Sequence, residues 1–499
     1  MKKILSLALS LILLLSLAVP AAAASDVQCP TIYVPGFLTS ALYTDTSDVS
    51  TKVSLPSSDE LLELVKKDLV PAVFDYTIDK DGDKLGHAVS KIANQAFSGY
   101  FYNSDGSAKD NAGAIMTYPS AASIRKNSNL YFHYDWRGDP VAIAEDLKNF
   151  IDYVTANSGS DKVALRCHSL GSVIATSYLT LYGNEKVMGV VFDAPALEGI
   201  TYIGELLCGR VEIAGDALLQ AMKDLLGENE YNELINSTLD ILEIAGLHNG
   251  AGDFLDGLVQ EIAPVLYEET LIPLFGYWPS VWAMTPDSYY QKATEYVFSN
   301  YFDGDEYAPL KEKISNYNNQ VRPYKKTTLL EFDKIGRMVV LSRYGFATLP
   351  VTNEWNVLSD TVVDTKNSSL GATTTVYGQS FSEEYLEGKD MSLISPDRTV
   401  DASTCLFPEK TWFIKNLKHD RTDVTKDLHL TLLFSEEEST VENSGLPRFM
   451  IFDAETDTLS EDKGEYKAPV EESETSSFLA KIMKFFTAIF NFFTNLFKK

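Results

Sequence analysis

The chain has 499 residues and a formal net charge of −28, from 70 acidic and 42 basic residues. This negative charge argues against nucleic acid as a partner, because binding to a phosphate backbone depends on clustered Lys and Arg. The length is too great for one simple domain and suits an enzyme core that carries insertions.

The first 24 residues have the features of a secretory signal peptide. Lys2 and Lys3 precede an apolar run that ends at Val19, and small residues follow up to Ala24. The apolar run is short for a membrane span. We therefore expect cleavage near Ala24 and a secreted protein, associated with a membrane or cell surface.

An alternation of strand and helix patterns follows. Apolar runs predict buried strands at 31–34, at 163–165 and within 186–199. A strand followed by a helix is predicted within 129–156, and an apolar helix is predicted at 170–182. This alternation predicts an α/β fold with a mostly parallel sheet that helices cover on both faces.

Insertions interrupt this core. The first part of the core is expected at 25–198, with an insertion at about 45–120. Segments with helical periodicity predict a large helical cap at 199–335. Strand patterns return at 336–436, which is the expected second part of the core.

Two further segments form the expected tail. Residues 437–476 contain a candidate hairpin and an acidic linker. The pattern of residues 477–499 predicts an amphipathic helix. Because all but a narrow face of this helix is apolar, we expect it to lie on a membrane surface rather than to pack against the core. The internal polar residues disfavour a membrane-spanning helix. The narrow polar face consists of Lys481, Lys484, Asn491, Asn495 and Lys498.

Cysteines and acidic residues give no metal or cofactor signal. Cys29, Cys167, Cys208 and Cys405 lack the close spacing of a zinc or redox site. Their even number permits disulfides, without fixing the pairing, and buried free thiols fit equally well. The acidic stretch at 79–83 lacks the glycine and the distant Glu of an EF-hand loop. We expect no metal and no cofactor.

The stretch "VALRCHSLGSVIATSYLTLYG", residues 163–183, places Ser169 between a strand and a helix. Its centre "CHSLG" matches the Gly-x-Ser-x-Gly nucleophile elbow, except that cysteine replaces the first glycine. Such a turn exposes the serine oxygen and leaves the Leu170 amide free to stabilise an oxyanion. We predict that Ser169 is a nucleophile, the alternative being an ordinary serine at a strand end.

A serine nucleophile needs a base that an acid holds in place. His419 is the predicted base, because it follows the last core strand pattern, "WFIKNLK". Asp397 is the predicted acid, because it lies on a Pro-marked turn ahead of His419. Asp401 and Asp193 are the alternatives for the acid.

Five motifs in this order resemble the lecithin–cholesterol acyltransferase family, which includes lysosomal phospholipases and diacylglycerol acyltransferases. They are "VPGFLTSALY", "YDWR", "HSLG", "RYGFATLP" and "DRTVDASTCLF". The resemblance implies an α/β-hydrolase with Ser169, Asp397 and His419 as its triad. It also implies that the amides of Phe37 and Leu170 form the oxyanion hole. The elbow cysteine and the cap depart from the family pattern, so the substrate stays open.

The expected chemistry is acyl transfer through an acyl-serine, with a lipid or another acyl ester as substrate. Water as acceptor gives a lipase or phospholipase, and an alcohol gives an O-acyltransferase; both use the same triad. Trp278 and Trp282 are candidates for an acyl groove, with a packed cap core as the alternative. A peptidase and a catalytically silent fold that binds a membrane surface are the other function classes. The sequence does not indicate which oligomeric state the protein adopts.

Overall fold

The computed structural model describes the greater part of the chain. The described residues are 29–54, 56, 60, 64–69, 71–72, 75–76, 82–126, 130–211 and 261–464. The expected signal peptide, the amphipathic segment 477–499 and cap residues 212–260 lie outside the described residues. Among the helices that are described, none combines the length and the apolar character needed to cross a membrane.

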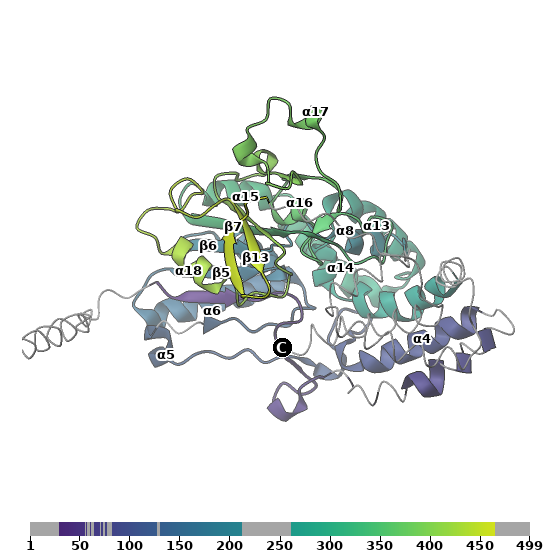
Figure 1. Cartoon of the computed structure of the whole chain (residues 1–499). Helices are drawn as coiled ribbons and strands as arrows, with labels where there is room; N and C mark the ends of the chain where they lie inside the picture. Colours follow the sequence, from purple (N-terminus) through teal and green to yellow (C-terminus); the bar gives the residue numbers. More distant parts are fainter. Residues whose placement is uncertain are drawn as a thin grey trace, which may run out of the picture.

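An eight-stranded sheet forms the centre of the molecule, in the order β14-β13-β12-β7-β6-β5-β1-β4 (Figure 1). All neighbouring strands run parallel except β13 and β14. The predicted mostly parallel sheet is therefore confirmed. The strands are β1 (Thr31–Val34), β4 (Leu130–Tyr131), β5 (Val163–His168), β6 (Val187–Asp193), β7 (Arg337–Tyr344), β12 (Thr411–Lys415), β13 (Phe449–Asp453) and β14 (Thr458–Glu461).

Helices cover both faces of this sheet, because successive side chains of its strands point to opposite faces and are apolar on both. On β5, Leu165 and Cys167 belong to the core on one face, whereas Ala164 belongs to the core on the other. The first face carries α5 (Ala121–Arg125), α6 (Pro140–Ser158), α7 (Leu170–Tyr182) and α15 (Lys325–Phe332), and the second carries α18 (Lys426–Leu433). This is the predicted α/β-hydrolase architecture.

The described part of the cap lies at one end of the sheet, where α14 packs on α6 (Figure 1). An aromatic cluster around Trp282 holds its helices together, with ring centroids 5.5 Å from Phe298 and 6.3 Å from Phe302. The elements are α8 (Thr201–Leu207), η5 (Tyr267–Gly276), α12 (Pro279–Ala283), α13 (Asp287–Asn300) and α14 (Ala308–Gln320).

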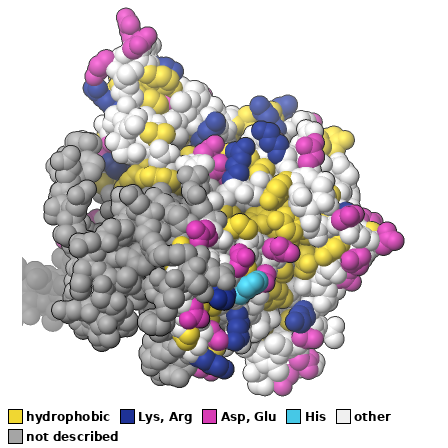
Figure 2. All heavy atoms as spheres, turned by 90° about the vertical axis from the view of Figure 1, so that its right-hand side faces the viewer, with side chains coloured by type: hydrophobic (Ala, Val, Ile, Leu, Met, Phe, Trp, Pro, Cys, Tyr) yellow, Lys and Arg dark blue, Asp and Glu magenta, His cyan; other side chains and the backbone are white. Residues whose placement is uncertain are grey.

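The segment between β1 and β4 adds α4 (Gly82–Ala96), which lies against η5 of the cap. His87 on α4 is 2.8 Å from Glu269 on η5. Figure 2 shows the side of the molecule that carries α4 and α13, where acidic, basic and apolar side chains are interspersed. This mixture of both charge signs is typical of a solvated protein surface.

A long irregular segment connects β7 to β12 and brings its residues back to the carboxyl ends of the strands. It contains the short strand β9 (Leu358–Ser359), which pairs with β8 (Phe346–Ala347) just beyond the end of β7. Its α17 (Glu383–Leu386) projects away from the sheet (Figure 1). The segment also contains α16 (Thr365–Ser368), β10 (Thr373–Thr374) and β11 (Val400–Asp401).

Candidate active site

Ser169 occupies the sharp turn between β5 and α7. Its backbone has φ 52° and ψ −122°, a conformation that residues other than glycine rarely adopt. The Ser169 amide donates to the Asp193 carbonyl over 3.1 Å, and its own carbonyl accepts from the Ser172 amide over 3.0 Å. The surrounding structure therefore holds a strained backbone in place, which is a frequent property of functional sites.

Two glycines allow this turn to pack tightly against the end of β1. A Cβ atom on Gly171 would lie only 2.1 Å from the Val34 carbonyl oxygen, so no side chain fits there. A Cβ atom on Gly36 would lie 2.8 Å from the Cβ of Ser169. The second glycine of the elbow pattern is thus required by helix–strand contact.

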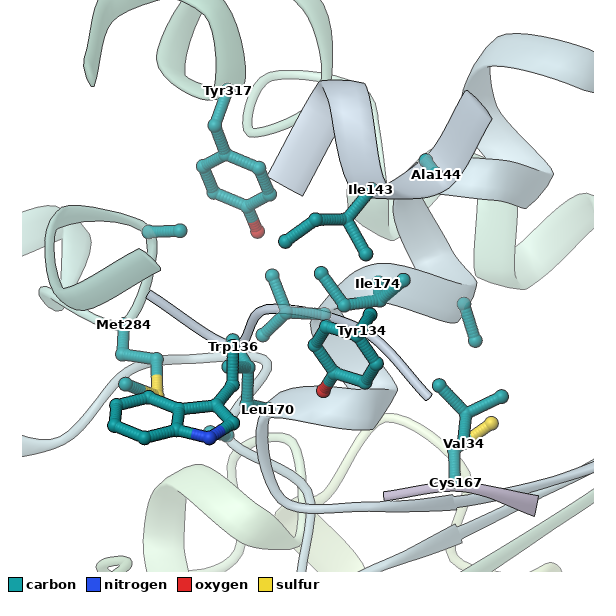
Figure 3. Packing of buried hydrophobic residues seen from close by; sticks show 14 of the residues in the cluster. Val34, Tyr134, Trp136, Ile143, Ala144, Cys167, Leu170, Ile174, Met284 and Tyr317 are labelled. Carbon is teal, nitrogen blue, oxygen red and sulfur yellow. The ribbon is translucent and has the colours of Figure 1, made fainter. Parts of the chain in front are cut away.

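The first glycine of the pattern is replaced by Cys167, whose side chain is accommodated by the core. Cys167 is paired with Val34 across the sheet, and Figure 3 shows their side chains together beneath α7. The thiol is buried, and this burial raises the pKa of Cys167. We conclude that this thiol is a packing group and not a nucleophile.

The two residues predicted for the oxyanion hole flank the same turn. Leu170 is the first residue of α7, and amides in the first turn of a helix have no carbonyl partner within that helix. Phe37 follows Gly36, the residue that touches the Ser169 side chain. The Phe37 ring packs 4.6 Å from Trp136, centroid to centroid, which fixes this turn. Figure 3 shows Trp136 beside Leu170.

The partner of His419 is Asp360. His419 Nδ1 lies 2.7 Å from Asp360 Oδ2, and the His419 amide donates to the Asp360 carbonyl over 3.0 Å. The other carboxylate oxygen accepts from the amides of Val362 and Val363, at 3.0 and 2.7 Å. Asp360 has no exposed surface. Because Nδ1 donates to the carboxylate, Nε2 of the neutral imidazole is left as the proton acceptor.

His168 connects this pair to the serine. Its ring centroid lies 4.6 Å from that of His419, and it directly precedes Ser169 in the chain. Burial, and secondarily the nearby His419, lower the pKa of His168 well below its ordinary value. His168 is therefore neutral at physiological pH and does not compete with His419 as a charged group.

The prediction that Asp397 supports His419 is wrong. The Asp397 carboxylate lies 2.9 Å from Lys415 Nζ and accepts from the Ser395 hydroxyl over 2.7 Å. Lys415 is the last residue of β12 and precedes His419 by four residues. The Asp397 turn therefore lies beside the end of β12. The charge of the Asp397 carboxylate is compensated by Lys415, and the carboxylate stabilises its own turn through Ser395.

Neither alternative acid contacts the His419 ring. Asp401 pairs with Lys389 at 2.9 Å and lies on β11. Asp193 pairs with Arg343 at 2.8 Å. The sequence reasoning missed Asp360 because it follows a strand of only two residues in the long irregular segment after β7.

The proposed acyl-groove tryptophans are packing residues. Trp282 is completely buried, and its indole N–H donates to the Gly276 carbonyl over 2.9 Å. Trp278 is 2% exposed and donates to the Tyr100 carbonyl over 3.1 Å. Its ring packs against Phe37, so Trp278 supports the turn that carries Phe37 from within the core. The packed-core alternative is correct for both indoles.

Metal ligation has no support in the part of the chain that the structure describes. There, no group of three or more His, Cys, Asp or Glu side chains is arranged to hold a metal ion.

The mostly parallel sheet with helices on both faces, and the sharp serine turn between β5 and α7, define an α/β-hydrolase fold. The family model described as "Serine aminopeptidase, S33" matches residues 138–232, which include the Ser169 turn and less than half of the chain. No curated protein matches the chain.

Two solved structures show faint similarity. One is the Tle4–Tli4 complex, with 15% identity, a TM-score of 0.19, and coverage of 36% of this chain and 48% of the matched chain. The other is a protein described as an aryl esterase from Burkholderia cenocepacia, with 12% identity and a TM-score of 0.17. That match covers 62% of this chain and 89% of the other. The chain thus spans about half the length of the first structure, and neither score supports a functional argument.

Proposed function

We propose that the chain is a serine hydrolase that cleaves carboxylic esters, with Ser169, His419 and Asp360 as its catalytic groups. The observation that carries this proposal is the 2.7 Å contact between His419 and the fully buried Asp360, together with the 4.6 Å distance between the His419 ring and that of His168, which directly precedes Ser169 and its φ of 52°. A structural histidine needs neither a buried carboxylate nor a strained serine beside it. The combination is that of a base prepared to activate a hydroxyl.

In the proposed reaction, the Ser169 oxygen attacks the ester carbonyl while His419 Nε2 takes its proton. Asp360 stabilises the imidazolium, and the amides of Phe37 and Leu170 donate to the oxyanion. Each such donor is worth about 2.7–4 kcal/mol of barrier. The tetrahedral intermediate collapses to an acyl-serine, and the alcohol leaves with the proton from His419. Water then attacks the acyl-serine by the same steps in reverse.

We further propose a lipid acyl ester as the substrate. The resemblance to the lecithin–cholesterol acyltransferase family supports this substrate class and supports an alcohol as a second acceptor. The amphipathic pattern of 477–499 supports a place at a membrane surface, and the signal-like N-terminus supports secretion. Water is the simpler acceptor for a secreted protein, so hydrolysis is the primary activity.

A peptidase is the second candidate, because the family matched over residues 138–232 is described as a serine aminopeptidase. The same three groups would attack an amide, and His419 would then give its proton to a leaving amine. The difference between the candidates lies in the leaving group and in the shape of the substrate pocket, so activity on matched substrates separates them.

The test is hydrolysis of p-nitrophenyl esters, acetyl through palmitoyl, compared with aminoacyl p-nitroanilides. Ser169→Ala should abolish ester hydrolysis. Ser172→Ala is the matched control, because it also removes a hydroxyl from the start of α7 and should keep the activity. Cleavage of anilides with little ester hydrolysis would favour the peptidase. Folded protein without either activity would contradict the proposal.

A further inference from the structure

Arg343 is a buried cation whose guanidinium spans two parts of the site. It lies near the end of β7 and has no exposed surface. One edge of the group binds the Asp193 carboxylate, with Nη2 at 2.8 Å from both oxygens. The other edge, through Nη1, donates to the carbonyls of Lys418 and His419 at 2.6 and 2.9 Å. The Arg343 side chain thus binds the backbone of the loop that carries His419.

Asp193, the partner of Arg343, also touches the nucleophile turn. Its backbone carbonyl accepts from the Ser169 amide at 3.1 Å and faces His168 Nδ1 at 3.2 Å. The ion pair between Asp193 and Arg343 is therefore a bridge. It joins the turn that carries the serine to the loop that carries His419.

The rest of the pocket around Asp193 keeps the carboxylate charged. Thr425 donates its hydroxyl to Asp193 over 2.7 Å, and His429 Nε2 lies 3.2 Å away. His429 Nδ1 accepts from Arg166 Nε over 3.1 Å, so the hydrogen of the neutral ring is carried by Nε2, the nitrogen nearer to Asp193. Burial raises the pKa of Asp193, but Arg343 and His429 outweigh it and hold the pKa well below its ordinary value.

From these contacts we infer that Arg343 is a positioning residue, which sets the His419 ring relative to Ser169 through the His419 and Lys418 carbonyls. This role rests on the proposed function. A planar fork is needed, because one cation must bind a carboxylate on one edge and two carbonyls on the other. Lysine would keep the charge and could not span both sides.

The matched control is Arg137, which has the same kind of environment elsewhere. Arg137 is also fully buried, pairs with Asp135 at 2.6 Å, and donates to the carbonyls of Tyr100 and Ala112 at 3.2 and 2.9 Å. None of its partners belongs to the His419 loop. Arg137→Lys therefore reports the general cost of replacing a buried, forked arginine.

The experiment compares Arg343→Lys and Arg137→Lys in the full chain, using p-nitrophenyl acetate. Both variants should unfold at a lower temperature than the wild type. We expect Arg343→Lys to lower kcat per folded molecule about 10- to 100-fold with KM unchanged, since a misplaced base slows chemistry without weakening substrate binding. Arg137→Lys should keep kcat within about 2-fold, on the same principle.

Equal kcat values for the two variants, in an active wild type, would overturn the positioning role and leave the proposed function intact. A folded wild type without esterase activity would overturn the proposed function, and the positioning role with it. Should Arg343→Lys fail to fold, Asp193→Asn replaces it, with Asp135→Asn as its control. Asp193→Asn should then show the selective loss of kcat, and its absence would count against the inference.

Discussion

Asp360 and His419 are joined twice, through the side chains at 2.7 Å and through the backbone at 3.0 Å. The second bond runs from the His419 amide to the Asp360 carbonyl, so the two loops cannot slide past each other without breaking both contacts. Asp360 therefore orients the His419 ring and selects its tautomer, while Arg343 holds the backbone of the same loop. In the proposed mechanism, the acid comes from the segment after β7.

Replacing Asp360 with Asn should leave the fold intact and lower kcat about 10³- to 10⁴-fold, because an amide favours the wrong tautomer of the base. Asp397→Asn is the informative control, since Asp397 pairs with Lys415 and does not contact His419 in the described structure. It should keep kcat within about 2-fold per folded molecule, because it touches no reacting group. The reverse ranking of the two variants would restore Asp397 as the acid.

Gly36→Ala should damage catalysis more than stability. The added methyl group would lie 2.8 Å from Ser169 Cβ and 3.0 Å from His168 Cδ2, so the nucleophile must move. A displacement approaching 1 Å costs on the order of 100-fold in rate. Gly388→Ala is the control, because its added Cβ would meet no atom within 4 Å, while its φ of +74° also makes the substitution strained. Unchanged kcat in Gly36→Ala would show that the turn has room to spare.

Asp364 should make stability depend on pH in an unusual direction. Burial raises its pKa to about 6, although the Thr201 amide donates to it over 2.8 Å. The folded state then keeps a proton that the unfolded state releases between pH 3.8 and 6. Its contribution to the free energy of unfolding therefore falls by ~3 kcal/mol as pH rises through this range.

Asp364→Asn removes this titration. Relative to wild type, the variant should gain ~3 kcal/mol between about pH 4 and pH 7, measured by urea unfolding at each pH. Asp161→Asn, which changes an exposed carboxylate, is the control for the change from Asp to Asn. A constant difference between Asp364→Asn and wild type at all pH values would contradict the raised pKa.

The cysteines should all titrate as thiols. The four, Cys29, Cys167, Cys208 and Cys405, are free in the structure. Denatured, unreduced protein should therefore react with a thiol reagent at all four. Native protein should react slowly, because burial also raises the pKa of Cys29 to about 11. A deficit of two thiols after denaturation would indicate a disulfide.

Much of the fold follows from local sequence patterns. The runs that form β5 and β6 are continuous and apolar because both faces of a parallel sheet are covered. Such runs can be recognised as strands from the sequence. Ser169 and His419 could be proposed for the same reason, since Ser169 directly follows β5 and His419 lies four residues after the end of β12. Their positions depend on the ends of regular elements, which sequence patterns predict well.

Asp360 depends on the path of an irregular segment, and no periodicity predicts such a path. Asp397 is nearer to His419 in the sequence, but its carboxylate forms an ion pair with Lys415. One signal for Asp360 was its place at the start of a turn, where an Asp side chain accepts hydrogen bonds from the backbone amides that follow it. In the structure, these donors are the amides of Val362 and Val363. Arg343 gave another signal, since an arginine within an apolar strand needs buried partners.

The most direct test of the nucleophile is reaction with an alkyl fluorophosphonate, followed by intact mass and peptide mapping. The Ser169 oxygen should form a bond to phosphorus as the P–F bond breaks and fluoride leaves. We predict one adduct per chain, on the peptide that contains Ser169, with no adduct in Ser169→Ala and slow labelling in Asp360→Asn. Folded wild-type protein that stays unlabelled, or that carries its label on another residue, would contradict the assignment of Ser169.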